Sequence, residues 1–161
     1  MARKTTLSLL FVCLFALSGR LQAESSKTIT LKVFDGKTGK PLVPTGFQVR
    51  ADHQQSFHND WVKPNEDGSA VLTVPDGTHD IALHLAYDQS QEIYVSCDAD
   101  KNAFGDVWYL VPQIMDKGFV AANGCAKSKA NDKYKTTAAP GELILFVRER
   151  NFKERASDFT R

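Results

Sequence analysis

Long hydrophobic runs are scarce in this 161-residue chain: one apolar stretch near its start is too short to cross a membrane, and no other segment is apolar enough. Cysteine is also rare, with three residues, and none stand in the close pairs that zinc sites use. Charge of one sign is not in excess, since 20 basic residues face 19 acidic ones, which argues against a nucleic-acid partner. The motifs Gly-x-Ser-x-Gly and His-Glu-x-x-His are missing. We therefore expect no enzymatic activity, no metal and no cofactor.

The one apolar stretch is typical of a secretory signal peptide. A basic start precedes an apolar run from Leu7 to Leu17, and a polar region that ends in Ala23 follows. We therefore expect residues 1–23 to be removed and the protein to be secreted or periplasmic, without insertion into the membrane. A lipoprotein cut before Cys13 is the alternative, and Val12 argues against it because a small residue should stand there.

The remaining 138 residues have the length of one ordinary domain. Removal of the signal peptide takes away three basic residues and no acid, so 17 basic residues then face 19 acidic ones. We expect a β-domain over residues 28–148 and a charged tail over 149–161, in which Phe152, Ala156 and Phe159 could share a helical face. Almost no linker follows the cleavage site, so we expect no catalytic domain in the same chain.

Alternation of apolar and polar residues predicts about seven short strands, and no long helical period competes with it. Such a chain favours an antiparallel β-sandwich of the immunoglobulin-like or transthyretin-like kind. Ala70 to Val74 is apolar on both faces, which predicts a central strand, and Gly141 to Val147 is expected to be buried on both sides. The other predicted strands are Thr28–Phe34, Phe47–Ala51, Ile81–Leu85, Ile93–Cys97 and Val107–Val111.

The same alternation predicts which side chains face the core. They are Ile29, Leu31, Val33, Phe47, Val49, Leu72, Val74, Ile81, Leu83, Leu85, Val95, Leu143, Leu145 and Val147.

Two cysteines, Cys97 and Cys125, remain after the signal peptide is removed. An even number in an oxidising compartment favours a disulfide bond between them. A zinc site and two free thiols are the alternatives. Zinc would need ligand pairs close together in the sequence, and none are found.

Glycine turns link the first strands in a distinctive order. Val33 runs into Asp35-Gly36-Lys37-Thr38-Gly39-Lys40-Pro41, and the bends Asp67-Gly68 and Pro75-Asp76-Gly77-Thr78 follow. Over Thr28 to Tyr87 this pattern resembles the carboxypeptidase regulatory-like module, a β-sandwich of the transthyretin-like and starch-binding-like class. The resemblance implies a sandwich that accompanies enzymes without being catalytic.

The related transthyretin-like hydroxyisourate hydrolases suggest an enzymatic alternative. Their first strand carries a catalytic histidine in a His-Val-Leu-Asp-type segment, and they end in Tyr-Arg-Gly-Ser. This chain has Lys32-Val33-Phe34-Asp35 at the first place and no Tyr-Arg-Gly-Ser. The resemblance in fold therefore does not imply that activity.

Two long connections interrupt the strands, His53 to Asn65 and the lysine-rich Ala126 to Pro140. His53 and His58 in the first could converge with Asp52 or Asp60, but the spacing is not diagnostic of a metal site, and exposed loop histidines are the simpler interpretation.

Flat aromatic rings are the remaining clue to function. Trp61 lies in the first long connection, and Trp108 and Tyr109 are adjacent on a predicted strand. We expect an exported, non-enzymatic binding or structural module whose partner is a protein or an envelope polymer. A carbohydrate-binding module is the alternative, with Trp61, Trp108 or Tyr109 stacking on a sugar and His58 or Asp60 supplying hydrogen bonds. Trp61 could instead cap one end of the sandwich.

Overall fold

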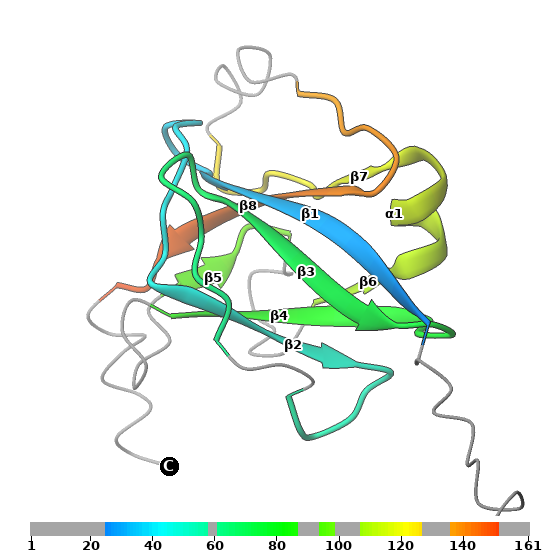
Figure 1. Cartoon of the computed structure of the whole chain (residues 1–161). Helices are drawn as coiled ribbons and strands as arrows, with labels where there is room; N and C mark the ends of the chain where they lie inside the picture. The colour runs from blue at the N-terminus through cyan, green and yellow to red at the C-terminus, as the bar shows by residue number, and fades with distance from the viewer. Residues whose placement is uncertain (1–24, 58–60, 87–93, 99–106, 127–135, 152–161) are drawn as a thin grey trace, which may run out of the picture.

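The computed structural model describes residues 25–57, 61–86, 94–98, 107–126 and 136–151. These residues form short strands and one short helix (Figure 1). The strands are β1 (Ser26–Asp35), β2 (Gly46–Ala51), β3 (Ser69–Pro75), β4 (Asp80–Ala86), β5 (Tyr94–Ser96), β6 (Trp108–Leu110), β7 (Phe119–Val120) and β8 (Glu142–Glu149); the helix is α1 (Val111–Lys117).

The strands build two sheets that face each other. One sheet has the order β3-β1-β8-β5, with β7 as a fifth strand that also pairs with β8, and the other has the order β2-β4-β6. In Figure 1 the second sheet lies beneath the first. Buried side chains of both sheets form one hydrophobic cluster. The prediction of an all-β sandwich is confirmed.

The core follows the alternation of the sequence. The predicted inward residues are buried, apart from Leu83 and Val95, which are half-buried. For Val95 the prediction is wrong: it pairs with Arg148, whereas Ser96 pairs with the inward Val147, so Val95 lies on the opposite face and Tyr94 enters the core in its place. Leu83 still packs against the main cluster. The apolar residues of alternating strands therefore define this core almost completely, since every second side chain of a strand points to the same face.

The last strand, β8, is buried on both faces, as predicted. Leu143, Leu145 and Val147 face the space between the sheets, whereas Ile144 and Phe146 face the opposite side. There they form a second, smaller cluster with Cys97, and Phe34, Val120, Cys125 and Ala138 pack around it. A continuous apolar run is what such a two-sided position requires.

A disulfide bond joins Cys97 to Cys125, with 2.07 Å between the sulfur atoms. Asn123 donates from Nδ2 to the carbonyl of Gly36 (2.9 Å) and accepts from the N–H of Cys125 (3.2 Å), so the bond lies against the turn after β1. The predicted pairing of the cysteines agrees with this geometry, and such bonds persist in oxidising compartments.

Two expectations about the sheets are wrong. The sandwich is not purely antiparallel, because β1 and β8 run parallel from Thr30↔Glu142 to Asp35↔Val147, and β7 is also parallel to β8. The predicted central strand is instead the edge strand β3, on which Val71 is 56% exposed. A strand with apolar residues on both faces is buried on both only where other elements cover each face. Among the described residues, the face of β3 that carries Val71 is not covered.

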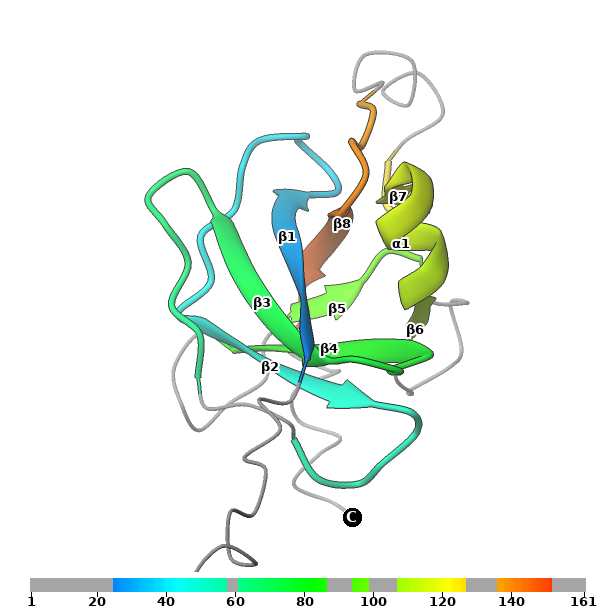
Figure 2. The ribbon, with the colours of Figure 1, turned by 45° about the vertical axis from the view of Figure 1, so that its right-hand side comes forward.

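The helix α1 was not expected, and it replaces the end of the predicted strand over Val107–Val111. It is two turns long and buries Val111 and Ile114, while the N–H of Gly118 donates to the carbonyl of Ile114 (2.9 Å). Figure 2 shows it beside β6 and β7 at one side of the sandwich. Pro112 in its first turn and Gly118 after its last residue are the usual punctuation of a helix, so the signal was present in the sequence.

The turn that follows β1 explains its own sequence. Asp35 accepts hydrogen bonds at Oδ1 from the N–H groups of Lys37 (3.0 Å) and Thr38 (2.7 Å) and from the hydroxyl of Thr38 (2.9 Å). Gly39 has a φ of 68°, which favours glycine. The residues of the Asp-x-x-Thr-Gly pattern therefore serve to form this turn, and no ligand is needed to explain them.

Two expected features fall outside the described residues. The lysine-rich connection Ala126 to Pro140 is described only at position 126 and over 136–140. Glu149, where the charged tail was expected to begin, is the last residue of β8. The residues of the expected helical face lie beyond position 151, outside the described part of the chain. No helix in the described residues is long and apolar enough to cross a bilayer.

Candidate ligand-binding face

The outer face of the three-stranded sheet gathers the functional candidates. Its register sets Arg50 of β2 opposite Ala82 of β4, and Ala82 opposite Trp108 of β6. The small side chain of Ala82 is 2% exposed, so neighbouring groups cover it. The guanidinium carbon of Arg50 lies 6.0 Å from the centre of the Trp108 ring. Alanine between them thus leaves room for a cation–π contact that spans the sheet.

A strained turn after β2 supplies the next ring. Asp52 and His53 both have positive φ values, 49° and 58°, although neither is glycine. The carboxylate of Asp52 holds this turn by accepting from the N–H groups of His79 (2.8 Å) and Asp80 (3.2 Å). The His53 ring then lies 4.1 Å from that of Trp108, centre to centre. Backbone strain of this kind costs of order 1 kcal/mol per residue and persists only where the surroundings hold it.

Further rings extend the cluster toward the start of β2. The Phe57 ring lies 5.9 Å from the Arg50 guanidinium carbon and 5.4 Å from the ring of His84. The centre of the Trp61 ring lies 6.0 Å from that of His84. We call the six residues Trp61, His84, Phe57, Arg50, Trp108 and His53 the aromatic strip, because each contacts the next in that order.

Trp61 is fixed by the backbone around it. Val62 and Phe47 exchange two hydrogen bonds, of 2.9 and 3.0 Å, so the segment runs beside the edge of β2. A Cβ added to Gly46 would lie 2.8 Å from Cε3 of the indole, which means that the ring packs directly on the glycine backbone. Trp61 therefore covers the start of β2 and also reaches His84, so capping the sandwich and joining the strip are compatible roles.

A carboxylate lies at the His53 end of the strip. Asp80 is largely buried, with 13% of its side chain exposed, and its Oδ2 lies 3.2 Å from Nε2 of His53 and 3.5 Å from Nδ1 of His79. Both imidazoles are well exposed, at 65% and 70%. The contact with Asp80 orients the His53 ring, which lies tilted against Trp108.

The structure separates the residues predicted to bind a ligand. Trp61 and Trp108 lie on one face, as members of the strip, and both are half-buried. Tyr109 is 4% exposed, faces the core and packs on Phe119, with 5.7 Å between the ring centres. Burial raises the pKa of the Tyr109 hydroxyl to about 12, and Ser96 lies 3.4 Å away. Tyr109 is therefore not accessible for stacking. His58 and Asp60 lie outside the described residues.

Four members of the strip were not assigned to a binding site from the sequence, namely Arg50, His53, Phe57 and His84. For Arg50 and His84 a signal existed, since the alternation of β2 and β4 puts both on the outer face. For His53 none did, because the turn that aims its ring depends on Asp52 and on the neighbouring β4. The metal alternative groups His53 and His58 with Asp52 or Asp60. His58 and Asp60 lie outside the described residues, and His53 contacts the carboxylate of Asp80.

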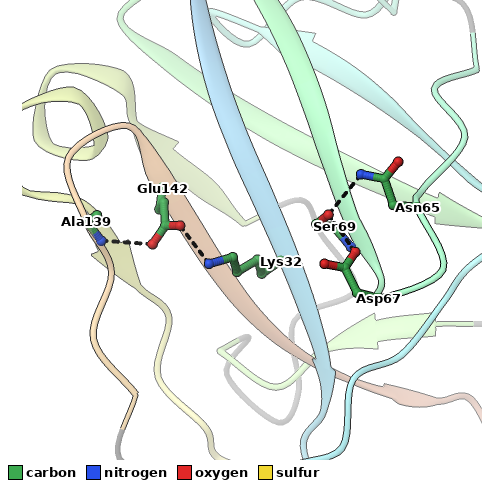
Figure 3. A network of polar contacts seen from close by, with 6 residues as sticks. All are labelled: Lys32, Asn65, Asp67, Ser69, Ala139 and Glu142. Carbon is green, nitrogen blue, oxygen red and sulfur yellow. Dashed lines mark hydrogen bonds and ion pairs between the residues drawn. The ribbon is translucent and has the colours of Figure 1, made fainter.

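Polar contacts on the five-stranded sheet form a separate group (Figure 3). Lys32 donates to Oε1 of Glu142 at 2.6 Å, and the N–H of Ala139 donates to Oε2 at 2.9 Å. Asp67 accepts at Oδ1 from the N–H and the hydroxyl of Ser69, at 2.9 and 2.6 Å. Lys32 is thus part of a link between β1 and β8.

In the described part of the chain, no three histidine, cysteine, aspartate or glutamate side chains are arranged to hold a metal ion. Comparison with protein-family models, with curated proteins and with solved structures gives no match.

Proposed function

We propose that the protein is an exported, non-enzymatic binding module whose ligand lies on the aromatic strip. The observation that carries this proposal is the meeting of Trp61 and Trp108, from distant parts of the sequence, in one chain of ring contacts on one sheet face. Rings that a sheet holds in place lose little conformational freedom when a ligand binds, which favours affinity. Strain in the adjoining turn is a second feature of functional sites.

Carbohydrate is the ligand class that this face suits best. A sugar has an apolar face that stacks on an aromatic ring and a polar rim that needs hydrogen-bond partners. The strip offers the rings of Trp61, Phe57 and Trp108, with His84 and Arg50 between them and His53 beyond Trp108 as hydrogen-bonding groups. Phe57 is 42% exposed, so at least part of the ring surface is open to a ligand.

The remaining features agree with this proposal without selecting the ligand. The apparent signal peptide and the disulfide bond fit a secreted or periplasmic protein. The resemblance to carboxypeptidase regulatory-like modules fits a sandwich that binds rather than catalyses. A protein partner or a non-carbohydrate envelope polymer on the same face is the competing possibility.

Affinity electrophoresis tests the proposal, with soluble glucans and peptidoglycan fragments in the gel. We expect the native protein to be retarded by at least one of them, and Trp61→Ala and Trp108→Ala each to weaken retardation by about tenfold in dissociation constant. Val71→Ala, an exposed apolar residue on the other sheet, is the matched control and should bind normally. Because Trp61 packs on Gly46, thermal unfolding of each variant must accompany the measurement. Absence of retardation on every polymer would exclude carbohydrate.

A further inference from the structure

The geometry points to an extended ligand: we infer that the aromatic strip binds a linear oligosaccharide across β2, β4 and β6, with one end at Trp61 and the other at Trp108. This inference rests on the proposed function, because it assumes that the ligand is a carbohydrate. It adds the size and direction of the ligand, and it separates the roles of the two tryptophans. A monosaccharide would touch only one of them.

The two tryptophans lie at opposite ends of the sheet face. Trp61 packs on Gly46, the first residue of β2, whereas Trp108 contacts Arg50, four residues further along the same strand. Four residues of a β-strand span roughly 13 Å. The two tryptophans also lie at opposite edges of the sheet. The segment that contains Trp61 lies beside the outer edge of β2, and Trp108 belongs to β6 at the other edge. A single sugar ring, which is about as large as an indole, cannot contact both.

Intermediate groups make the path between the tryptophans continuous. His84 and Phe57 follow Trp61 at centre-to-centre steps of 6.0 and 5.4 Å, and Arg50 follows Phe57 at 5.9 Å. Rings and hydrogen-bond donors thus alternate along the path. A guanidinium carries five N–H donors, so Arg50 can bind sugar hydroxyl groups in addition to the contacts it makes within the chain. Each sugar of a chain would meet both an apolar surface and a polar partner.

The Trp108 end is fixed before any ligand binds. The turn at Asp52 and His53 is held because the Asp52 carboxylate accepts hydrogen bonds from the N–H groups of His79 and Asp80, at the start of β4. His53 contacts Asp80, and its ring lies 4.1 Å from that of Trp108. At the other end Trp61 is fixed by the paired backbone of Val62 and Phe47. Two fixed contact points at the ends of one path favour a ligand long enough to reach both, because the second contact is then intramolecular.

The test is isothermal titration calorimetry of the full mature protein with oligosaccharides of increasing length, from monosaccharide to hexasaccharide. The series is taken from whichever polymer retards the protein. We expect affinity to increase by at least about tenfold between the disaccharide and the hexasaccharide, since the longer ligand gains a second stacking contact. Trp61→Ala and Trp108→Ala should each abolish most of this increase.

Matched variants keep the test decisive. Trp61→Phe and Trp108→Phe preserve a ring and should restore most of the dependence on length, even if an alanine variant folds poorly. A disaccharide can contact only one of the two tryptophans, so at most one of the two alanine variants should bind it much more weakly than the native protein does. The hexasaccharide contacts both, so each alanine variant should bind it more weakly. If affinity is the same for all lengths, or if one tryptophan has no effect on the longest ligand, the inference is wrong although the proposed function stands. If the polymer itself does not bind, the proposed function fails first.

Discussion

At the scale of single residues, the packing around the disulfide depends on a missing side chain. Gly36 follows β1, and a Cβ at that position would lie 2.4 Å from Sγ of Cys97 and 2.8 Å from Oδ1 of Asn123. Neither neighbour is free to move, because the sulfur is bonded to Cys125 and Asn123 bonds the Gly36 carbonyl. Glycine is therefore required here by close approach and not by the geometry of the turn.

We predict that Gly36→Ala lowers the free energy of unfolding by about 1–3 kcal/mol, because the added methyl group overpacks a rigid site. Urea denaturation measures this change. In a Cys97→Ala/Cys125→Ala background the nearest obstructing atom is gone, so the same substitution should cost clearly less. An equal cost in both backgrounds would contradict the proposed clash.

At the scale of secondary-structure elements, the parallel pairing of β1 with β8 holds the five-stranded sheet together. A link between Lys32 and Glu142 crosses this pair, and the same carboxylate accepts from the N–H of Ala139 just before β8 (Figure 3). The Ala139 N–H, together with the Lys32 ammonium, holds the pKa of the Glu142 carboxyl below its ordinary value of 4.5. The folded chain thus binds this proton less readily than the unfolded chain does.

This lowered pKa fixes the sign of a pH dependence. The stabilisation by ionised Glu142 is fully present above the pKa of the unfolded chain and is lost as the pH falls through the lower value of the folded chain. We therefore predict that Glu142→Gln loses less stability than the native protein between about pH 6 and pH 3. Chemical denaturation at several pH values measures the free energy of unfolding of both proteins. Glu66 is exposed, so Glu66→Gln serves as the control. Parallel curves for the native protein and Glu142→Gln would refute the assignment.

At the scale of the whole molecule, the disulfide closes the sandwich over its second cluster. It connects the segment after β7 to the end of β5, and both flank the outer face of β8, where Ile144 and Phe146 are buried. Loss of the bond would therefore release the layer that covers an otherwise exposed apolar surface, as well as increase the freedom of the unfolded chain.

We predict that the exported protein has no titratable thiol under denaturing, non-reducing conditions, and that Cys97→Ala/Cys125→Ala lowers its stability by about 2–5 kcal/mol. Thiol titration and guanidinium denaturation are the two measurements. Reduced native protein should match the double variant in stability. Two reactive thiols in freshly purified material would show that the bond does not form in the exported protein.

The sequence by itself determined the two-sheet class of the fold, most of the core and the cysteine pair. Alternation of period two is a local property, and it assigned Arg50 and His84 to the outer face and Leu72 and Val74 to the inner one. The side chains of Trp108 and Tyr109 had to point in opposite directions for the same reason.

Tertiary structure alone decided which element lies beside which. The edge position of β3, the parallel pairing of β1 with β8 and the turn that aims His53 at Trp108 all depend on contacts between distant segments. Local patterns carry no information on strand order, because the hydrophobic effect is not directional. Burial of an apolar face is favourable whichever apolar element covers it. The aromatic strip belongs to this second kind of information: its members become neighbours only when β2, β4 and β6 pair.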